Sequence, residues 1–122
     1  LEFMHIHKTG ALIRAAILLG ALAGSLSDAE MAELDHYGKC IGLLFQVVDD
    51  ILDATADTAT LGKTAGKDAS HNKPTYVSLM GLAQSRAFAE TLSRDADASL
   101  ATFGEAAWPL KALNHYIISR QF

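Results

Sequence analysis

Hydrophobic residues recur at helical spacing along most of the 122-residue chain, and no segment shows the strict alternation of a half-buried strand. The pattern predicts four helices. The first covers about residues 1–24 and contains Gly10 near its centre, where we expect a kink. The second begins at a capping box formed by Ser27 and Glu30 and extends to about Ala54. The sequence therefore predicts an all-α fold.

A polar segment separates the second predicted helix from the third. Residues 55–73 contain two glycines and three lysines, and an unstructured segment of this length in a compact domain is usually functional. Pro74 suits the first turn of a third helix, with Asn72 or Lys73 as its cap, and Gly104 ends that helix. Within it, residues 93–99 are polar enough to be a solvated stretch. Pro109 opens a short last helix.

The first predicted helix contains an apolar run, residues 11–26, that imitates a secretory signal. Arg14 lies inside the run, and an arginine in a hydrocarbon layer is costly. The run is also shorter than the roughly 20 residues that a membrane span needs. We therefore expect a buried core helix and no membrane span. The chain begins with Leu1 rather than methionine, and we expect truncation there, because residues 1–8 already resemble the inside of a helix.

Composition and charge narrow the class of protein. Half of the residues are hydrophobic and 20% are charged, as in a small globular domain with its own core. The net charge of −4 does not favour nucleic acid as a partner. Cys40 is the one cysteine, which excludes an internal disulfide and favours a reducing compartment such as the cytoplasm. Its apolar neighbours indicate a buried residue rather than a nucleophile.

Three acids gather near the end of the second predicted helix, at Asp49, Asp50 and Asp53. Spacings of three and four residues place their carboxylates on one side of a helix, and Gln46 lies one turn earlier. Such close anions repel one another unless a cation offsets them. Oxygen ligands suit Mg²⁺, with Mn²⁺ as a substitute. The alternative is a solvated acidic helix end, against which the flanking apolar residues, Phe45 among them, argue.

Basic residues surround this cluster in the sequence. Lys63 and Lys67 each follow a glycine in the succeeding segment, and Lys73 precedes the third predicted helix. Lysines so placed can close over a diphosphate, although exposed loop lysines are the alternative, and the glycine spacing is not that of a P-loop. Upstream, Lys8 and Thr9 stand next to the expected kink, where a cation and a freed backbone carbonyl can point inward.

Together these motifs resemble a known family. The order H-K-T-G-A-L-I-R, F-Q-V-V-D-D-I-L-D, G-K-T-A-G-K-D and N-K-P-T-Y is similar to the C-terminal half of the trans-isoprenyl diphosphate synthases, especially the bacterial farnesyl diphosphate synthases, or geranyltranstransferases. The resemblance covers nearly the whole chain. It implies that residues 1–122 are the C-terminal portion of a single polyprenyl synthetase domain, an isoprenoid synthase helical bundle whose N-terminal half is absent.

The resemblance also implies an activity. Such enzymes condense isopentenyl diphosphate with an allylic diphosphate, here geranyl to farnesyl diphosphate, through a Mg²⁺-assisted allylic carbocation. The implied metal group is Asp49, Asp53 and Asp50, of which Asp50 orients and hydrogen-bonds more than it ligates. By the same resemblance, Lys8, Lys63 and Lys73 bind the allylic diphosphate. Lys8, Thr9 and Gln46 are the implied catalytic residues, of which Lys8 binds the leaving group while Thr9 and Gln46 steady the carbocation. Phe45 lines the isopentenyl side of the cavity.

Several alternatives stay open. The first aspartate motif and the N-terminal G-x-K-x-R of the family are missing from this sequence, so we expect no turnover by the chain alone. The resemblance also implies a homodimer for the protein that includes the N-terminal half. One alternative is a longer-chain synthase that makes geranylgeranyl diphosphate. Others are a non-catalytic prenyl synthase subunit, against which the retained acids argue, and a helical interaction module with an acidic patch.

Overall fold

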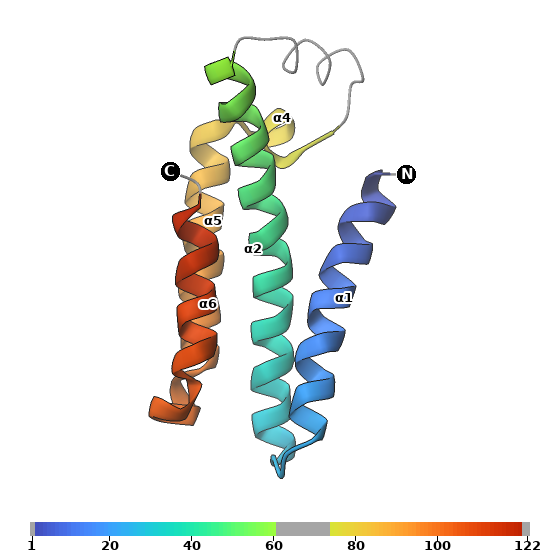
Figure 1. Cartoon of the computed structure of the whole chain (residues 1–122), viewed down its shortest axis with the longest axis vertical. Coiled ribbons are helices and arrows are strands. Elements are labelled where there is room, and N and C mark those ends of the chain that lie inside the picture. Colours follow the sequence, from blue (N-terminus) through green and yellow to red (C-terminus); the bar gives the residue numbers. More distant parts are fainter. Residues whose placement is uncertain (1, 61–73, 121–122) are drawn as a thin grey trace.

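The computed structural model describes residues 2–60 and 74–120, with side chains for residues 9–56 and 74–120. No strand occurs in these residues, so the all-α prediction is confirmed. The elements are α1 (Glu2–Leu22), α2 (Asp28–Thr60), α4 (Tyr76–Met80), α5 (Leu82–Ser99), the 3₁₀ segment η1 (Ala101–Ala107) and α6 (Trp108–Ser119) (Figure 1).

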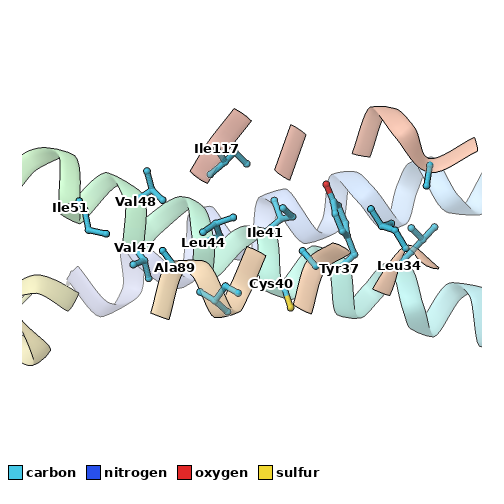
Figure 2. Close-up of a cluster of buried hydrophobic side chains, with 14 of the residues drawn as sticks. Leu34, Tyr37, Cys40, Ile41, Leu44, Val47, Val48, Ile51, Ala89 and Ile117 are labelled. Atoms are coloured by element: carbon cyan, nitrogen blue, oxygen red, sulfur yellow. The ribbon is translucent and has the colours of Figure 1, made fainter. Parts of the chain in front are cut away.

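The long helix α2 is the centre of the bundle. Helix α1 packs along one side of it, α5 and α6 pack on the other, and α4 lies against its C-terminal part (Figure 1). The apolar stripe that the sequence predicts on this helix supplies most of the core. Its buried members are Leu34, Tyr37, Ile41, Leu44, Val47, Val48 and Ile51, which meet Ala89 of α5 and Ile117 of α6 (Figure 2).

The start of α2 agrees with the sequence, and its end does not. The Ser27 amide donates to Glu30 Oε1 at 2.8 Å and the Glu30 amide to Ser27 Oγ at 3.1 Å, which confirms the capping box. The predicted end at Ala54 is wrong, because the helix continues to Thr60. Thr55 is satisfied inside the helix, since its hydroxyl donates to the Ile51 carbonyl at 2.9 Å.

The predicted third helix is divided into α4, α5 and η1. Gly81, with φ +85°, separates α4 from α5, and Gly104, with φ +63°, lies inside η1. The cap of α4 is Thr75 rather than the residues before Pro74, because its hydroxyl accepts the amide of Ser78 at 3.0 Å. The start of the last helix around Pro109 is confirmed.

Residues 93–99 are not the solvated stretch that their polarity suggests. Ser93 and Ala96 are buried, and Asn114 of α6 is fully buried against them. The Asn114 amide donates to the Ser93 carbonyl at 2.9 Å and to Asp97 Oδ1 at 2.8 Å, while Ser93 Oγ donates to Asn114 Oδ1 at 2.9 Å. Polar groups of α5 are thus buried because α6 partners them.

Helix α1 differs from the expected kinked, buried helix in two ways. It runs unbroken through Gly10. One of its faces is open, because Leu12, Leu19 and Leu22 are each 69–70% exposed, so this helix is half-covered by the described part of the chain. Within the described residues, no helix has the length and hydropathy of a membrane span.

Candidate functional site

The contact between α1 and α2 sets the geometry of the candidate site. A Cβ added to Gly42 of α2 would lie 3.0 Å from the Cα of Gly10 and 3.3 Å from its carbonyl oxygen. One turn earlier, a Cβ on Gly38 would lie 3.4 Å from the Cα of Arg14. Two glycines four residues apart therefore allow the two backbones to approach closely.

This contact also fixes the register of the two helices. They run antiparallel (Figure 1), with Gly10 opposite Gly42. Each helix rises about 1.5 Å per residue, so a step from Gly10 toward the start of α1 matches an equal step from Gly42 toward Gln46. Lys8 and Thr9 thus lie beside the turn of α2 that leads to Gln46. Thr9 is half-buried, and the side chain of Lys8 lies outside the described residues.

Within the acid cluster of α2, Asp49 and Asp50 turn to different neighbours. Asp50 is buried and accepts the Gln46 amide Nε2 at 2.9 Å and the backbone N–H of Tyr76 at 2.9 Å. Asp49 Oδ1 accepts from Arg120 at 3.3 Å, and Asp53 is exposed. Asp50 therefore ties α2 to α4, whereas Asp49 faces α6.

Two of the clustered acids lie on one face of this helix. Asp49 and Asp53 are four residues apart and so share that face. Among the residues that the structure describes, no three His, Cys, Asp or Glu side chains form a group that could hold a metal by themselves. Mg²⁺ is usually bound through one or two carboxylates, with water and substrate phosphate completing the shell. The donor set of this helix fits that cation.

Phe45 lines a small apolar pocket beside the acids. The pocket, about 270 Å³, lies over α2 between α1 and α6, and Ile13, Ile41 and Ile117 contribute to its walls. At its rim the guanidinium carbon of Arg120 lies 4.9 Å from the centre of the Phe45 ring. The pocket thus combines an apolar floor with a cation next to the carboxylate of Asp49.

A second cavity, of about 440 Å³, lies between α1, α2 and α4 and includes Arg14, Lys39 and Tyr76 in its walls. Arg14 forms a two-bond ion pair with Asp35, whose other neighbour is Lys39 Nζ at 3.6 Å. The hydrogen bonds from Arg14 hold the pKa of Asp35 below its usual value. Burial, followed by the charge of Asp50, raises the pKa of Tyr76. Both cations of this cavity face the carboxylate of Asp35, just as Arg120 of the Phe45 pocket faces that of Asp49.

The other residues singled out in the sequence include two lysines and the cysteine. Lys63 and Lys73 lie outside the described residues. Cys40 is buried, as predicted, and burial raises the pKa of its thiol, so it is not an activated nucleophile.

Sequence reasoning missed Arg120, because nothing near the end of the chain singles it out. It also missed the glycine pair on α2, although glycines four residues apart in a helix are a readable sign of close packing.

Comparison with known proteins first identifies the fold. The chain superimposes on a protein of Marinomonas sp. provisionally named a farnesyl-diphosphate synthase with a TM-score of 0.77 and 42% identity, over 96% of this chain and 38% of that one. It superimposes on the geranyltransferase of Helicobacter pylori with a TM-score of 0.65 and 29% identity, over 98% of this chain and 38% of that one. The helical bundle is that of the isoprenoid synthases.

The family follows from the sequence match. Residues 1–104 match the polyprenyl synthetase family, and the chain belongs to it. The chain is 53% identical to the chloroplastic geranylgeranyl pyrophosphate synthase of Catharanthus roseus over 121 residues, which are 98% of this chain and 34% of that protein. It is 50% identical to the mitochondrial geranylgeranyl pyrophosphate synthase 10 of Arabidopsis thaliana. The chain spans about a third of the length of the curated relatives that it matches.

Proposed function

We propose that this chain supplies the second aspartate motif of a short-chain trans-prenyltransferase, which condenses isopentenyl diphosphate with an allylic diphosphate. The observation that carries the proposal is the position of Asp49. It lies on the face of α2 that it shares with Asp53, beside the Phe45 pocket, and one to two turns beyond the contact between α1 and α2. Membership of the polyprenyl synthetase family supports the same activity.

The residues of α2 would hold the metal. Asp49 and Asp53 would bind Mg²⁺, or Mn²⁺ as a substitute, and the bound cation would neutralise charge on the departing diphosphate. Asp50 accepts two hydrogen bonds from protein groups, so its contribution would be to orient its neighbours rather than to ligate. Lys8, Lys63 and Lys73 would bind the diphosphate as point charges.

Gln46 is oriented for the part that we assign to it. An ionised carboxylate only accepts hydrogen bonds, so the 2.9 Å contact with Asp50 fixes the NH₂ group of Gln46 toward that residue. The amide oxygen consequently points away from Asp50. A carbonyl dipole fixed in this way stabilises positive charge without reorganising during the reaction. We assign Gln46 to the allylic carbocation and Phe45 to the isopentenyl side of the cavity. The resemblance gives the Thr9 carbonyl the same part as Gln46, but α1 runs unbroken through Gly10 and so has no kink that frees this carbonyl.

Two product lengths are candidates. The sequence motifs favour farnesyl diphosphate, whereas the relatives at 50–53% identity are named geranylgeranyl pyrophosphate synthases. The chain is more similar to these relatives than to the Marinomonas protein, with which it shares 42% identity. The longer product, geranylgeranyl diphosphate, is therefore the second candidate. The homodimer and the cytoplasmic location expected from the resemblance stay predictions, as does the assignment of residues 1–122 to one domain that a further N-terminal portion completes.

A chimera tests the proposal directly. This chain would replace the matching third of the Catharanthus roseus synthase, and purified chimera would be incubated with labelled isopentenyl diphosphate, an allylic diphosphate and Mg²⁺. We expect condensation by the chimera and none by the 122-residue chain alone. Asp49→Ala in the chimera should lower kcat by about 10²-fold or more, because stabilisation of the leaving group is lost.

The matched control is Glu90→Ala, at an exposed position on α5, which should leave kcat unchanged. A chimera that turns over equally well with both Asp49→Ala and Asp53→Ala would refute the assignment of the metal site. Chromatography of the products would also report whether this third of the protein shifts the chain length from that of the host enzyme.

A further inference from the structure

Arg120, at the end of α6, has an arrangement that packing alone does not explain. Its Nη2 donates to Asp49 Oδ1 at 3.3 Å, and its guanidinium lies over the Phe45 ring at 4.9 Å. The Arg120 side chain is 26% exposed and that of Asp49 is 37% exposed. Within the described part of the chain, Arg120 Nε is buried and has no hydrogen-bond partner. A buried donor without an acceptor is unfavourable unless a ligand or water completes it.

The ion pair and the proposed metal site use the same carboxylate. A divalent cation bound by Asp49 would stand next to the guanidinium, and like charges at this distance repel strongly outside bulk water. A metal ion on Asp49 would therefore favour a position of Arg120 away from this carboxylate. The guanidinium carries five N–H donors in a planar fork that matches the oxygens of a phosphate, and the Phe45 ring supports its face. A diphosphate bound through the same metal would bring acceptors within reach of that fork.

We propose that Arg120 is the resident counterion of Asp49 in the ligand-free protein and moves to the diphosphate when the metal occupies Asp49. This inference rests on the metal site proposed above. It gives the residue two opposite effects: it competes with the free metal ion for Asp49, and it adds a contact to the metal–diphosphate complex. A structural clamp between α6 and α2 has neither effect, because loosening a clamp weakens the two kinds of binding together.

The test uses the 122-residue chain and two probes. Mn²⁺ alone is titrated by water proton relaxation, and inorganic pyrophosphate is titrated in excess Mg²⁺ by calorimetry. Arg120→Gln should bind Mn²⁺ severalfold more tightly, because a competing cation is gone. It should bind Mg²⁺–pyrophosphate about tenfold more weakly, because charge-assisted hydrogen bonds are lost. Arg120→Lys should keep the wild-type affinity for Mn²⁺ and lose part of the affinity for pyrophosphate, since an ammonium lacks the fork.

The control is Arg94→Gln on α5, an exposed arginine that bonds Thr91 Oγ1 at 3.2 Å, and it should change neither affinity. Equal changes of the same sign for both probes in Arg120→Gln, or no change in either, would overturn the role of Arg120. Asp49→Ala separates this failure from that of the metal site. If it leaves Mn²⁺ binding as in the wild type, both ideas fail; if it weakens Mn²⁺ binding while Arg120→Gln changes nothing, only the role of Arg120 fails.

A measurement on the wild-type chain guards against a variant that does not fold. The Nε–H resonance of Arg120, assigned by its disappearance in Arg120→Lys, should shift on addition of Mg²⁺ and shift further on addition of pyrophosphate. The first shift reports that the guanidinium moves when its Nη2 loses the contact with Asp49, and the second reports a new acceptor. A resonance that stays in place through both additions would overturn the proposal.

Discussion

The backbone N–H of Tyr76 donates a hydrogen bond to Asp50 Oδ2 at 2.9 Å, although the two residues are 26 positions apart. The other oxygen of the same carboxylate accepts from the Gln46 side chain. Asp50 thus joins α4 to α2 and orients a residue that we assign to the reaction. In the D-D-x-x-D sequence, the middle acid organises the site while its neighbours remain on the face proposed to bind metal.

We predict that Asp50→Ala lowers the free energy of unfolding by about 2–3 kcal/mol. Its loss leaves the half-buried Tyr76 amide and Gln46 side chain without their acceptor, and an unsatisfied buried donor costs about 1–3 kcal/mol. Urea denaturation followed by circular dichroism measures the change. Glu90→Ala, on the exposed face of α5, should lie within about 0.5 kcal/mol of the wild type. Equal stability of the two variants would mean that Asp50 does not secure α4.

Alanine substitutions of one glycine in each of the first two helices should change the stability of the chain in opposite directions. In Gly42→Ala the new methyl group meets the backbone of Gly10 at 3.0 Å, and overpacking of this kind costs about 1–3 kcal/mol. In Gly20→Ala the methyl group meets nothing within 4 Å, so the gain in helix propensity of about 0.5–1 kcal/mol should appear as stabilisation. Thermal melts of both variants give the comparison, and a rise of the melting temperature in Gly42→Ala would show that the helices can separate freely.

Local patterns predicted the parts of the fold that local interactions decide. The Ser27–Glu30 box and the apolar stripe of α2 are confirmed, because a cap and a helix face depend on residues three or four positions apart. Residues 93–99 were mispredicted as solvated because their partner, Asn114, lies in another helix. The division at Gly81 was missed because a single glycine inside a helical pattern is often tolerated.

The residues of the candidate site also divide into those with a local sequence signal and those whose contacts are long-range. Asp49, Asp53, Gln46 and Phe45 could be singled out because they lie within one short motif. Arg120 could not, since its contact with Asp49 spans 71 positions and no spacing rule links the ends of two packed helices. The turn of Asp50 toward α4 was likewise hidden, because helical spacing gives the face of a residue and not its partner.

The buried amide of Asn114 should contribute more to stability than the exposed contact between His115 and Asp97 beside it. Asn114→Ala removes the hydrogen bonds to Ser93 and Asp97 in a position with no solvent access, and we expect a loss of about 2–3 kcal/mol. The neighbouring His115 contacts Asp97 Oδ2 at 2.8 Å but is exposed, so His115→Ala should cost less than about 1 kcal/mol. Chemical denaturation measures both, and a reversed order would place the α5–α6 contact on the surface pair.

The ion pair between Arg14 and Asp35 should give the chain a pH-dependent contribution to stability. Arg14 lowers the pKa of Asp35 below its ordinary value of 3.8, chiefly through hydrogen bonding. The stabilisation is therefore complete above the aspartate pKa of the unfolded chain, and it is lost as the pH falls through the lowered pKa of the folded state. Arg14→Gln should melt below the wild type at pH 7, and the difference should shrink once the pH drops below about 3.9.

Melting temperatures of the wild type and Arg14→Gln, measured from pH 7 down to about 2.5, test this dependence. The pair is solvent-accessible, with side chains 43% and 26% exposed, so the difference should be modest and should also decline with added salt. The control is Arg94→Gln on α5, away from Asp35, whose pKa is lowered. The difference in melting temperature between this variant and the wild type should not vary with pH. If the Arg14→Gln deficit persisted unchanged at pH 2.5, it would arise from lost packing of the arginine stem against Gly38 and not from the charge of Asp35.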